Sequence, residues 1–403
     1  MEFFLQIIFW GSALAMAHSY VFYPQLMRLL AAGKRPNEQV FAPDDPELPV
    51  VSVLMSVYNE ERVIAEKLEH LHGLRYPPEK LFVFIGSDAS DDATNEFVAA
   101  YRRRFPAGHF HFEAFAERRG KPPVINELAR LAREGVPAAA GQQVFLLTDA
   151  SVMLQPDTLY HLAKHFKNPA IGAVDAHMRS TGLQAEGISR SEDRYLSGEV
   201  QLKHWEGLAW GMMIGPFGGC YALRADLFEP IPPRSLVDDF WLVFRVLEKG
   251  FRAINDLDAV CLEGATHRVS DEYQRKKRIA AGSFQNLARF RRWVLPPATR
   301  LGFAFFSHKV LRWFGGFFLL AMLLSAGMLG LHNQFYCGLF WLQLIGYAGV
   351  WAALKFQHRL PGFSIAPLKN IAYFLAMNLA LLDGFFKWAR GIRSGAWQRT
   401  NRA

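Results

Sequence analysis

The sequence predicts an α/β domain, with a mostly parallel β-sheet flanked by helices, that is joined to transmembrane α-helices. Two observations lead to this fold class. Between residues 50 and 298, short apolar runs alternate with segments of helical periodicity, a pattern typical of parallel sheets whose strands are linked by helices. At both ends of the chain lie apolar stretches of about 20 residues, the length that a membrane-spanning helix requires.

The composition agrees with a soluble domain that carries a few membrane segments. Of the 403 residues, 51% are hydrophobic, which is high for a soluble enzyme and low for a protein made of membrane helices alone. The formal net charge of +8 suits nucleic acid, anionic lipid or anionic substrates. Nucleic acid is disfavoured, because the basic clusters do not form one stripe interleaved with aromatic residues. The three cysteines are far apart, which argues against a zinc site or a disulfide framework.

The first segment, residues 1–36, is expected to be a transmembrane helix with a basic flank. Residues 3–27 are mostly apolar, and three basic residues follow within residues 28–35. Because basic residues collect on the cytoplasmic side of a membrane, the soluble domain, residues 37–298, is expected to lie in the cytoplasm. The chain is therefore expected to be an integral membrane protein, of the kind found in a bacterial inner membrane.

Residues 299–388 are expected to hold the C-terminal transmembrane helices, and residues 389–403 a basic tail. Spans are predicted at residues 310–331, 335–354 and about 367–386. One span before the soluble domain and three after it would place the basic tail outside, against the charge rule. Either one segment is re-entrant or interfacial, for which the amphipathic residues 308–313 are a candidate, or the tail breaks the rule.

The elements of the soluble domain can be assigned to residue ranges. Strands are expected at residues 50–57, 81–85, 109–115 and 144–147. Helices are expected at residues 60–74, 91–105 and 121–134, where apolar residues recur at helical spacing.

Acidic residues follow three of the predicted strands. Glu60 follows the first strand, Asp88 the second and Asp149 the fourth. Ligands of open α/β sheets bind beyond the carboxyl ends of the strands, so these side chains are candidates for one shared site. Each acid alone is weak evidence, because Asp and Ser after a strand also cap the next helix.

In order and spacing, these motifs resemble those of glycosyltransferase family 2, inverting enzymes with the GT-A fold, a Rossmann-like mixed sheet. The resemblance covers about residues 50–282 and rests on a YNE-like run at residues 58–60, an SDGSxD-like run at 87–92, an R-x-GK-like segment at 118–121 and a D-x-D-like motif at 149–151. Ala89 replaces the usual glycine, and Ser151 replaces the second acid of D-x-D. The flanking helices are similar to those of the membrane-bound branch, which includes ceramide glucosyltransferase and poly-N-acetylglucosamine synthase.

The resemblance implies a nucleotide-sugar donor, with UDP as its nucleotide. Tyr58, Asn59 and Glu60 would line the base and the ribose, and Asp88 would hydrogen-bond the uracil. Lys121 would offset the charge of the phosphates, with an ordinary surface lysine as the alternative.

A divalent metal ion is also implied by the resemblance. Asp149 would hold Mg²⁺ or Mn²⁺, which prefer oxygen ligands, where the ion bridges the diphosphate. Ser151 would bind the ion weakly or through water.

The resemblance places the acceptor side of the site later in the chain. Gly218 and Gly219 would border the sugar and acceptor pocket, with a structural bend as the alternative. Asp239 would be the general base of an inverting transfer, and Asp238 would cap the following helix and orient its neighbour. The alternative is that both acids serve the helix dipole.

The segment 273–282 resembles the QxxRW motif of membrane-bound members. Arg278 stands on the motif arginine, Arg275 on its glutamine, and Ile279 replaces the tryptophan. Arg278 and Arg275 would then contact the diphosphate of the donor. A basic helix on anionic lipid is the alternative, and both can hold at once.

These expectations define a function. The chain is expected to be a metal-dependent, inverting glycosyltransferase that moves a sugar from a UDP-sugar to a lipid-linked or glycan acceptor at the cytoplasmic membrane face. A processive polysaccharide synthase is one alternative, which the absent tryptophan disfavours. A catalytically inactive, nucleotide-binding membrane scaffold is another.

Overall fold

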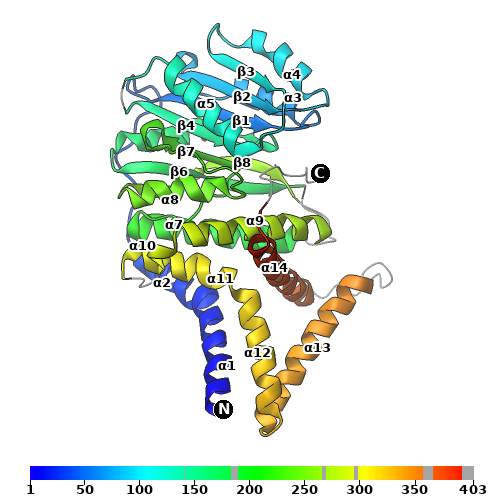
Figure 1. Ribbon diagram of the computed structural model, residues 1–403. Helices are drawn as coiled ribbons and strands as arrows, with labels where there is room; N and C mark the ends of the chain where they lie inside the picture. Colours follow the sequence, from blue (N-terminus) through cyan, green and yellow to red (C-terminus); the bar gives the residue numbers. More distant parts are fainter. Residues whose placement is uncertain (140, 183–188, 266–268, 295–297, 357–365, 393–403) are drawn as a thin grey trace. The chain divides into compact units, whose positions relative to one another are not determined.

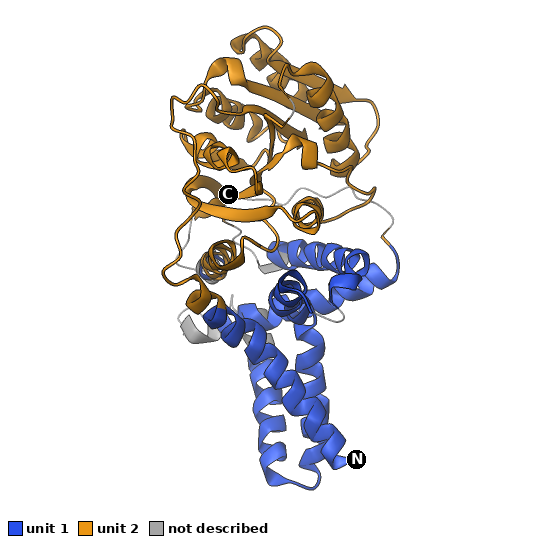
Figure 2. Ribbon diagram, turned by 90° about the vertical axis from the view of Figure 1, so that its left-hand side faces the viewer, with its two compact units in different colours: residues 1–26, 184–194, 266–391 blue, residues 27–183, 195–265, 392–403 orange. Residues whose placement is uncertain are grey.

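The computed structural model describes residues 1–139, 141–182, 189–265, 269–294, 298–356 and 366–392. The chain divides into two compact units (Figure 2). The helical unit comprises residues 1–26, 184–194 and 266–391, and the sheet unit comprises residues 27–183, 195–265 and 392–403.

The sheet unit is built on one eight-stranded mixed sheet with the strand order β3-β2-β1-β4-β7-β6-β8-β5 (Figure 1). Its strands are β1 (Val50–Val57), β2 (Leu81–Asp88), β3 (Phe110–Phe115), β4 (Gln143–Thr148), β5 (Val152–Leu154), β6 (Ile171–Thr181), β7 (Cys220–Arg224) and β8 (Arg252–Gly264). Strands β3, β2, β1 and β4 are parallel, and β7 pairs antiparallel with β4. Strand β6 pairs antiparallel with β7 and parallel with β8. The expected α/β fold is confirmed.

Continuous apolar runs form the parallel strands because both faces of the sheet are covered. Strand β1 has its predicted bounds, and all of its residues after Val50 are buried. Strand β2 is buried throughout and extends to Asp88, three residues beyond its predicted end. This extension places the Asp88 carboxylate inside the sheet rather than in a loop.

The helices of the sheet unit begin later than predicted in two cases. They are α3 (Ile64–His72), α4 (Thr94–Tyr101), α5 (Lys121–Gly135), α6 (Thr158–Ala163) and α8 (Asp238–Glu248). Helix α3 was predicted from residue 60, but Asn59 has a left-handed φ of 54° and the helix starts at Ile64. Helix α7 (Ser189–Trp210) belongs to the sheet unit from residue 195 onward.

The helical unit contains the apolar ends of the chain. Its elements are α1 (Glu2–Ala17), α9 (Val269–Arg289), α10 (Arg300–Ala304), α11 (Leu311–Trp313), α12 (Gly315–Gly330), α13 (Gln334–Phe356) and α14 (Ala366–Ala389). Helix α1 continues through a π-helical turn into α2 (Tyr23–Ala31). Helices α12 and α13 are joined by a short turn and pack against each other (Figure 1).

Within the described residues, two helices are long and apolar enough to cross a membrane, Glu2–Ala31 and Asn370–Ala389. A third crossing results if Arg300–Trp313 and Gly315–Gly330, which meet at an angle of 61°, are counted as one span. The number of crossings and the side of the C-terminus stay predictions, and most of the predicted basic tail lies outside the described residues.

The segment predicted as an interfacial helix has no exposed polar face. It is a π-helical turn, Phe305–Val310, followed by α11. His308 and Arg312 are buried, and Arg312 donates to the side-chain and backbone oxygens of Ser19 at 3.3 and 3.2 Å. The amphipathic pattern of the sequence therefore reflects polar contacts between helices, and an interfacial position stays a prediction.

Helix α14 approaches α9 closely at Gly384. A Cβ atom on Gly384 would lie 2.3 Å from the Cβ of Ala280, so a larger residue does not fit there. Beside this contact, Asp383 Oδ2 accepts hydrogen bonds from the Tyr273 hydroxyl and the Lys277 ammonium, both at 3.0 Å. Close backbone packing at Gly384 and the Lys277–Asp383 ion pair beside it thus join α9 and α14.

Candidate active site

Lys121 connects acidic residues that come from separate strands and helices of the sheet unit. Its Nζ lies 2.7 Å from Asp149 Oδ1 and 3.8 Å from Asp238 Oδ2. Burial alone would lower the pKa of the Lys121 ammonium, but the charges of Asp149 and Asp238 outweigh it and raise this pKa above its ordinary value. Lys121 is therefore a fixed positive charge between two carboxylates, which excludes the alternative of an ordinary surface lysine.

Asp88 holds the turn that precedes α5, the helix that begins at Lys121. The Asp88 carboxylate is fully buried and accepts hydrogen bonds from the backbone N–H groups of Arg119, at 2.6 Å, and Gly120, at 2.9 Å. Gly120 has a φ of 87°, which suits glycine, and it precedes the first residue of α5. Both oxygens of Asp88 thus hold the turn before Lys121, and a contact of Asp88 with uracil stays a prediction.

The ring of Tyr58 offers a flat surface beside this turn. The guanidinium carbon of Arg118 lies 3.4 Å from the centroid of the Tyr58 ring, and its Nε lies 3.9 Å from Asp88 Oδ2. A stacked guanidinium occupies the kind of position in which a planar base would stack. Arg118 entered the sequence argument only as part of a motif, and its contact with Tyr58 makes it a candidate binding residue.

Asn59 and Glu60 organise the loops at the ends of β1 and β2. The Asn59 side chain donates to Asp91 Oδ1 at 2.6 Å and accepts from the Asp91 N–H at 3.1 Å. The Glu60 N–H donates to Thr94 Oγ1 at 2.8 Å. The structure therefore gives Asn59 and the Glu60 backbone a role within the loops, whereas contacts of the two side chains with a nucleotide stay predictions.

Asp149 directly follows β4, at the end of its antiparallel pairing with β7. Its N–H donates to the carbonyl of Gly219 at 3.1 Å, and its side chain is 40% exposed, so it can reach a ligand. Ser151 follows it in the turn between β4 and β5 and is partly exposed. Of the predicted metal ligands, Asp149 is the one carboxylate.

The donor set fits a metal ion that the substrate helps to hold. Among the described residues, no group of three or more His, Cys, Asp or Glu side chains could hold an ion by itself. Mg²⁺ commonly uses one or two carboxylates together with substrate phosphates and water. Asp149 with Ser151 suits an ion whose remaining ligands are diphosphate oxygens and water.

Gly218 lies directly against the predicted general base. Gly218 has a φ of 80°, and a Cβ atom on it would lie 2.6 Å from Asp239 Oδ2. A Cβ atom on Gly219 would lie 2.7 Å from Cε of Met178. The two glycines thus form a tight bend, and at Gly218 this bend also contacts the carboxylate of Asp239.

Asp238 and Asp239 begin α8 and have different environments. Burial first, and then the negative charge of Asp238, raise the pKa of the Asp239 carboxyl to about 7, although the Phe240 N–H and Lys121 act in the opposite direction. A carboxylate with a pKa near neutrality is well suited to accept a proton at physiological pH. The structure therefore brings Lys121, Asp149, Asp238 and Asp239 together, as the motif argument expected.

Two further residues support the site: Asn126, which follows the R-x-GK-like segment, and Lys67, which lay outside the sequence argument. Asn126 forms a reciprocal pair with the backbone of Ile231, at 2.9 and 2.8 Å, and so ties α5 to the segment before α8. Lys67 is fully buried, and its ammonium donates to Thr148 Oγ1 at 2.7 Å and to the carbonyl of Val152. Its signal in the sequence is a lysine on the apolar face of a helix, which alone does not indicate a site.

The predicted diphosphate-binding arginines lie on α9, in the helical unit. Arg275 Nη1 lies 3.1 Å from Glu192 Oε1 and 3.4 Å from Glu272 Oε2, and both glutamates are buried. Arg278 follows one turn later on the same helix. The binding of a diphosphate by Arg275 and Arg278 stays a prediction.

Curated relatives include glycolipid and polysaccharide synthases. The β-monoglucosyldiacylglycerol synthase of Trichormus variabilis is 23% identical over 301 residues, which are 74% of this chain and 61% of that protein. The poly-β-1,6-N-acetyl-D-glucosamine synthase of Staphylococcus aureus strain COL is 30% identical over 134 residues, 33% of this chain and 29% of that protein. The chain thus spans about three fifths of the length of the β-monoglucosyldiacylglycerol synthase that it matches.

A solved structure shows the same fold. The mannosyltransferase PcManGT of Pyrobaculum calidifontis, in complex with GDP-Man and Mn²⁺, superposes with a TM-score of 0.69 at 22% identity and covers 96% of this chain and 99% of that one. This likeness confirms the GT-A architecture predicted from the motifs.

Family patterns match most of the chain. The pattern of glycosyl transferase family 2 matches residues 52–222, and that of glycosyl transferase family group 2 matches residues 144–380, more than half of the chain. These matches confirm the resemblance inferred from the strand-end motifs. The protein belongs to glycosyl transferase family group 2.

Proposed function

We propose that the protein transfers a sugar from a nucleotide-sugar to a lipid acceptor, with inversion, at the cytoplasmic face of a membrane. The observation that carries the proposal is the cluster of Lys121, Asp149, Asp238 and Asp239. It combines a partly exposed carboxylate, a fixed cation and a carboxyl whose pKa is raised to about 7.

In this proposal, Asp239 is the general base. It accepts the proton of the acceptor hydroxyl as the oxygen attacks the anomeric carbon, on the face opposite the leaving nucleotide. Asp238 supports this role, because its charge contributes to the raised pKa of Asp239. Gly218 leaves no side chain between its backbone and the Asp239 carboxylate.

Lys121, Asp149 and the nucleotide-binding loops would hold the donor. Lys121 would contact the diphosphate, and Asp149 with Ser151 would hold Mg²⁺ or Mn²⁺. A bound ion would neutralise negative charge on the diphosphate. Tyr58 and Arg118 would stack with the nucleobase of the donor, near Asp88. Mn²⁺ in the complex of the mannosyltransferase PcManGT supports the use of a divalent ion.

The acceptor class is proposed from the relatives and from the apolar helices. A relative that matches 74% of the chain is named as a β-monoglucosyldiacylglycerol synthase, which supports a diacylglycerol-like lipid as acceptor. The helices Glu2–Ala31 and Asn370–Ala389 support an integral membrane location. UDP-glucose is the first donor to test, with UDP-N-acetylglucosamine and GDP-mannose as alternatives.

The test is a release assay with purified full-length protein in lipid vesicles that contain diacylglycerol. Each UDP- or GDP-sugar is supplied with Mn²⁺ or with EDTA, and nucleotide release and glycolipid formation are measured. We expect one donor to give a monoglycosylated lipid, and Asp239→Asn to lower kcat by roughly 10²- to 10⁴-fold. If the wild-type protein releases no nucleotide from any donor with any acceptor, the scaffold alternative replaces the transferase.

A polysaccharide synthase is the second candidate, because poly-β-1,6-N-acetyl-D-glucosamine synthases match part of the chain. Product length separates the two candidates. A single added sugar supports the lipid glycosyltransferase, and a ladder of polymer lengths from UDP-N-acetylglucosamine supports the synthase.

A further inference from the structure

A buried ion pair lies behind the bend that contains Gly218. It joins Asp175 on β6 to Lys203 on α7, with Lys203 Nζ 2.5 Å from Asp175 Oδ2. The two side chains are 0% and 2% exposed, respectively. Burying two charges costs free energy that their attraction does not always return, so such a pair is weak evidence for stability. The contacts of the pair therefore indicate its role better than its effect on stability does.

Both members of the pair contact Phe217, the residue immediately before Gly218. Asp175 Oδ1 accepts a hydrogen bond from the Phe217 N–H at 3.3 Å. The Lys203 ammonium lies 3.6 Å from the centroid of the Phe217 ring, in a cation–π contact. The pair thus fixes the backbone and the side chain of Phe217 at once.

Gly218, the residue after Phe217, lies against Asp239, the proposed general base. Gly218 has a φ of 80°, which suits glycine, and its α-carbon faces Asp239 so closely that a Cβ would lie 2.6 Å from Oδ2. Covalent geometry limits the movement of Gly218 when Phe217 is held. An unbroken series of contacts therefore leads from Lys203 through Asp175 and Phe217 to the carboxylate of Asp239.

We propose that the Asp175–Lys203 ion pair is a positioning device that holds the Phe217–Gly218 segment against the carboxylate of Asp239. The inference rests on the proposed role of Asp239 as general base. A misplacement of about 1 Å at a reacting group can lower a rate by about 100-fold. Loss of the pair would lower kcat, whereas the KM for the donor would change little, because Lys121 is held by Asp149 and Asp238 and by the turn that Asp88 fixes.

Single substitutions are unsuitable, because each would leave one buried charge without its counterion. Two double variants avoid this. Asp175→Asn with Lys203→Met removes both charges and keeps an oxygen that can accept from the Phe217 N–H. Asp175→Leu with Lys203→Met has a similar shape and removes this acceptor as well. The difference between the two variants isolates the hydrogen bond to Phe217.

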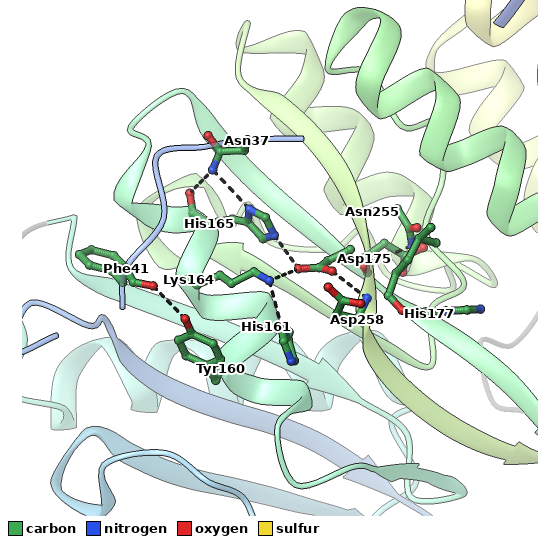
Figure 3. A network of polar contacts seen from close by, with 12 residues as sticks. Asn37, Phe41, Tyr160, His161, Lys164, His165, Asp175, His177, Asn255 and Asp258 are labelled. Atoms are coloured by element: carbon green, nitrogen blue, oxygen red, sulfur yellow. Dashed lines mark hydrogen bonds and ion pairs between the residues drawn. The ribbon is translucent and has the colours of Figure 1, made fainter. Parts of the chain in front are cut away.

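A matched control exists in the same unit. Asp256 Oδ2 lies 2.9 Å from Lys164 Nζ and 2.7 Å from His165 Nε2, and all three side chains are at most 15% exposed. Figure 3 shows Lys164 and His165 in this polar network, which also includes Asn37. Asp256→Asn with Lys164→Met therefore removes a Lys–Asp pair that is at most 15% exposed, without changing a contact of Phe217.

The experiment measures kcat, the KM for the donor and the thermal unfolding midpoint of all variants in the full-length protein. We expect kcat to fall between about 10- and 100-fold in the Leu/Met variant and less in the Asn/Met variant, with donor KM within about twofold of wild type. The control is expected to keep the wild-type kcat.

Three results would overturn the inference. One is a folded Leu/Met variant with the wild-type kcat. Another is an equal loss of kcat in the control, which would reveal a general effect of stability. The third is full activity of Asp239→Asn, in which case the proposed function fails as well. An inactive Asp239→Asn beside fully active double variants would overturn the positioning role alone.

Discussion

The α-carbon of Gly218 faces the carboxylate of Asp239 so closely that a methyl group on Gly218 would lie 2.6 Å from Oδ2. We therefore expect Gly218→Ala to displace Asp239 and lower kcat by about 100-fold or more. Gly108→Ala is the matched control, because Gly108 also has a positive φ, 84°, and a Cβ there meets nothing within 4 Å. Both substitutions strain the backbone, so equal losses of kcat would contradict the role of the contact.

The raised pKa of Asp239 predicts the pH dependence of the transfer. A general base must be deprotonated, so kcat/KM is expected to fall as the pH drops below about 7, the pKa of Asp239. Lys121 lowers this pKa, so Lys121→Met is expected to move the acidic limb to higher pH. A pH profile of nucleotide release measures both effects, and a limb that stays in place would contradict the coupling of Lys121 to Asp239.

Asp88 is expected to act through the backbone that it holds. Asp88→Ala leaves the N–H groups of Arg119 and Gly120, the second of them buried, without their acceptor and is expected to destabilise the protein by about 1–3 kcal/mol. The KM for the donor would rise as Lys121 shifts. Denaturant unfolding and donor kinetics test this expectation. If Asp88 instead reads the base, Asp88→Asn will change the preference between UDP- and GDP-sugars at unchanged stability.

The single carboxylate of the D-x-D-like motif predicts weak metal binding. EDTA is expected to lower the activity, and added Mn²⁺ to restore it. Ser151→Asp would add a second carboxylate and is expected to lower the Mn²⁺ concentration that gives half-maximal activity. Asp149→Asn is expected to raise it. Activity that is insensitive to EDTA in every variant would show that Lys121 offsets the diphosphate charge without an ion.

Tyr221 offers a test of stability. Its hydroxyl is buried and has no hydrogen-bond partner among the described residues. Removing an unsatisfied buried group is neutral or favourable, so Tyr221→Phe is expected to leave the free energy of unfolding unchanged or raise it by about 1 kcal/mol. Thermal or denaturant unfolding measures the change. Destabilisation would mean that the hydroxyl finds a partner, such as ordered water.

The sequence predicts those elements that have a strong local pattern and those residues that stand in functional motifs. Strand β1 has its predicted bounds because a continuous apolar run between polar residues is a strong strand signal. Asp149, Asp238 and Asp239 could be assigned to one site because they stand in recognisable motifs. Their meeting at Lys121 follows from the order of the strands in the sheet.

The supporting residues could not be predicted, because their partners are distant in the sequence. Asp175 stands within the apolar run of β6, and Lys203 on a helix, where neither has a local signal. Their pairing depends on the strand order β4-β7-β6, which the sequence leaves open. The bond from the Asn59 side chain to Asp91 could not be predicted either, since loop contacts of this kind depend on the neighbouring strand end.

The antiparallel pairing of β4 with β7 has a consequence for how enzymes of this architecture can diversify. Tyr58, Lys121 and Asp149, which are proposed to hold the donor, come before β7 in the chain, and the proposed general base Asp239 comes after it. Asp149 N–H and the Gly219 carbonyl join the two sides. Substitutions that retune sugar or acceptor choice can thus accumulate on one side while the other is inherited unchanged, provided that this junction keeps its shape.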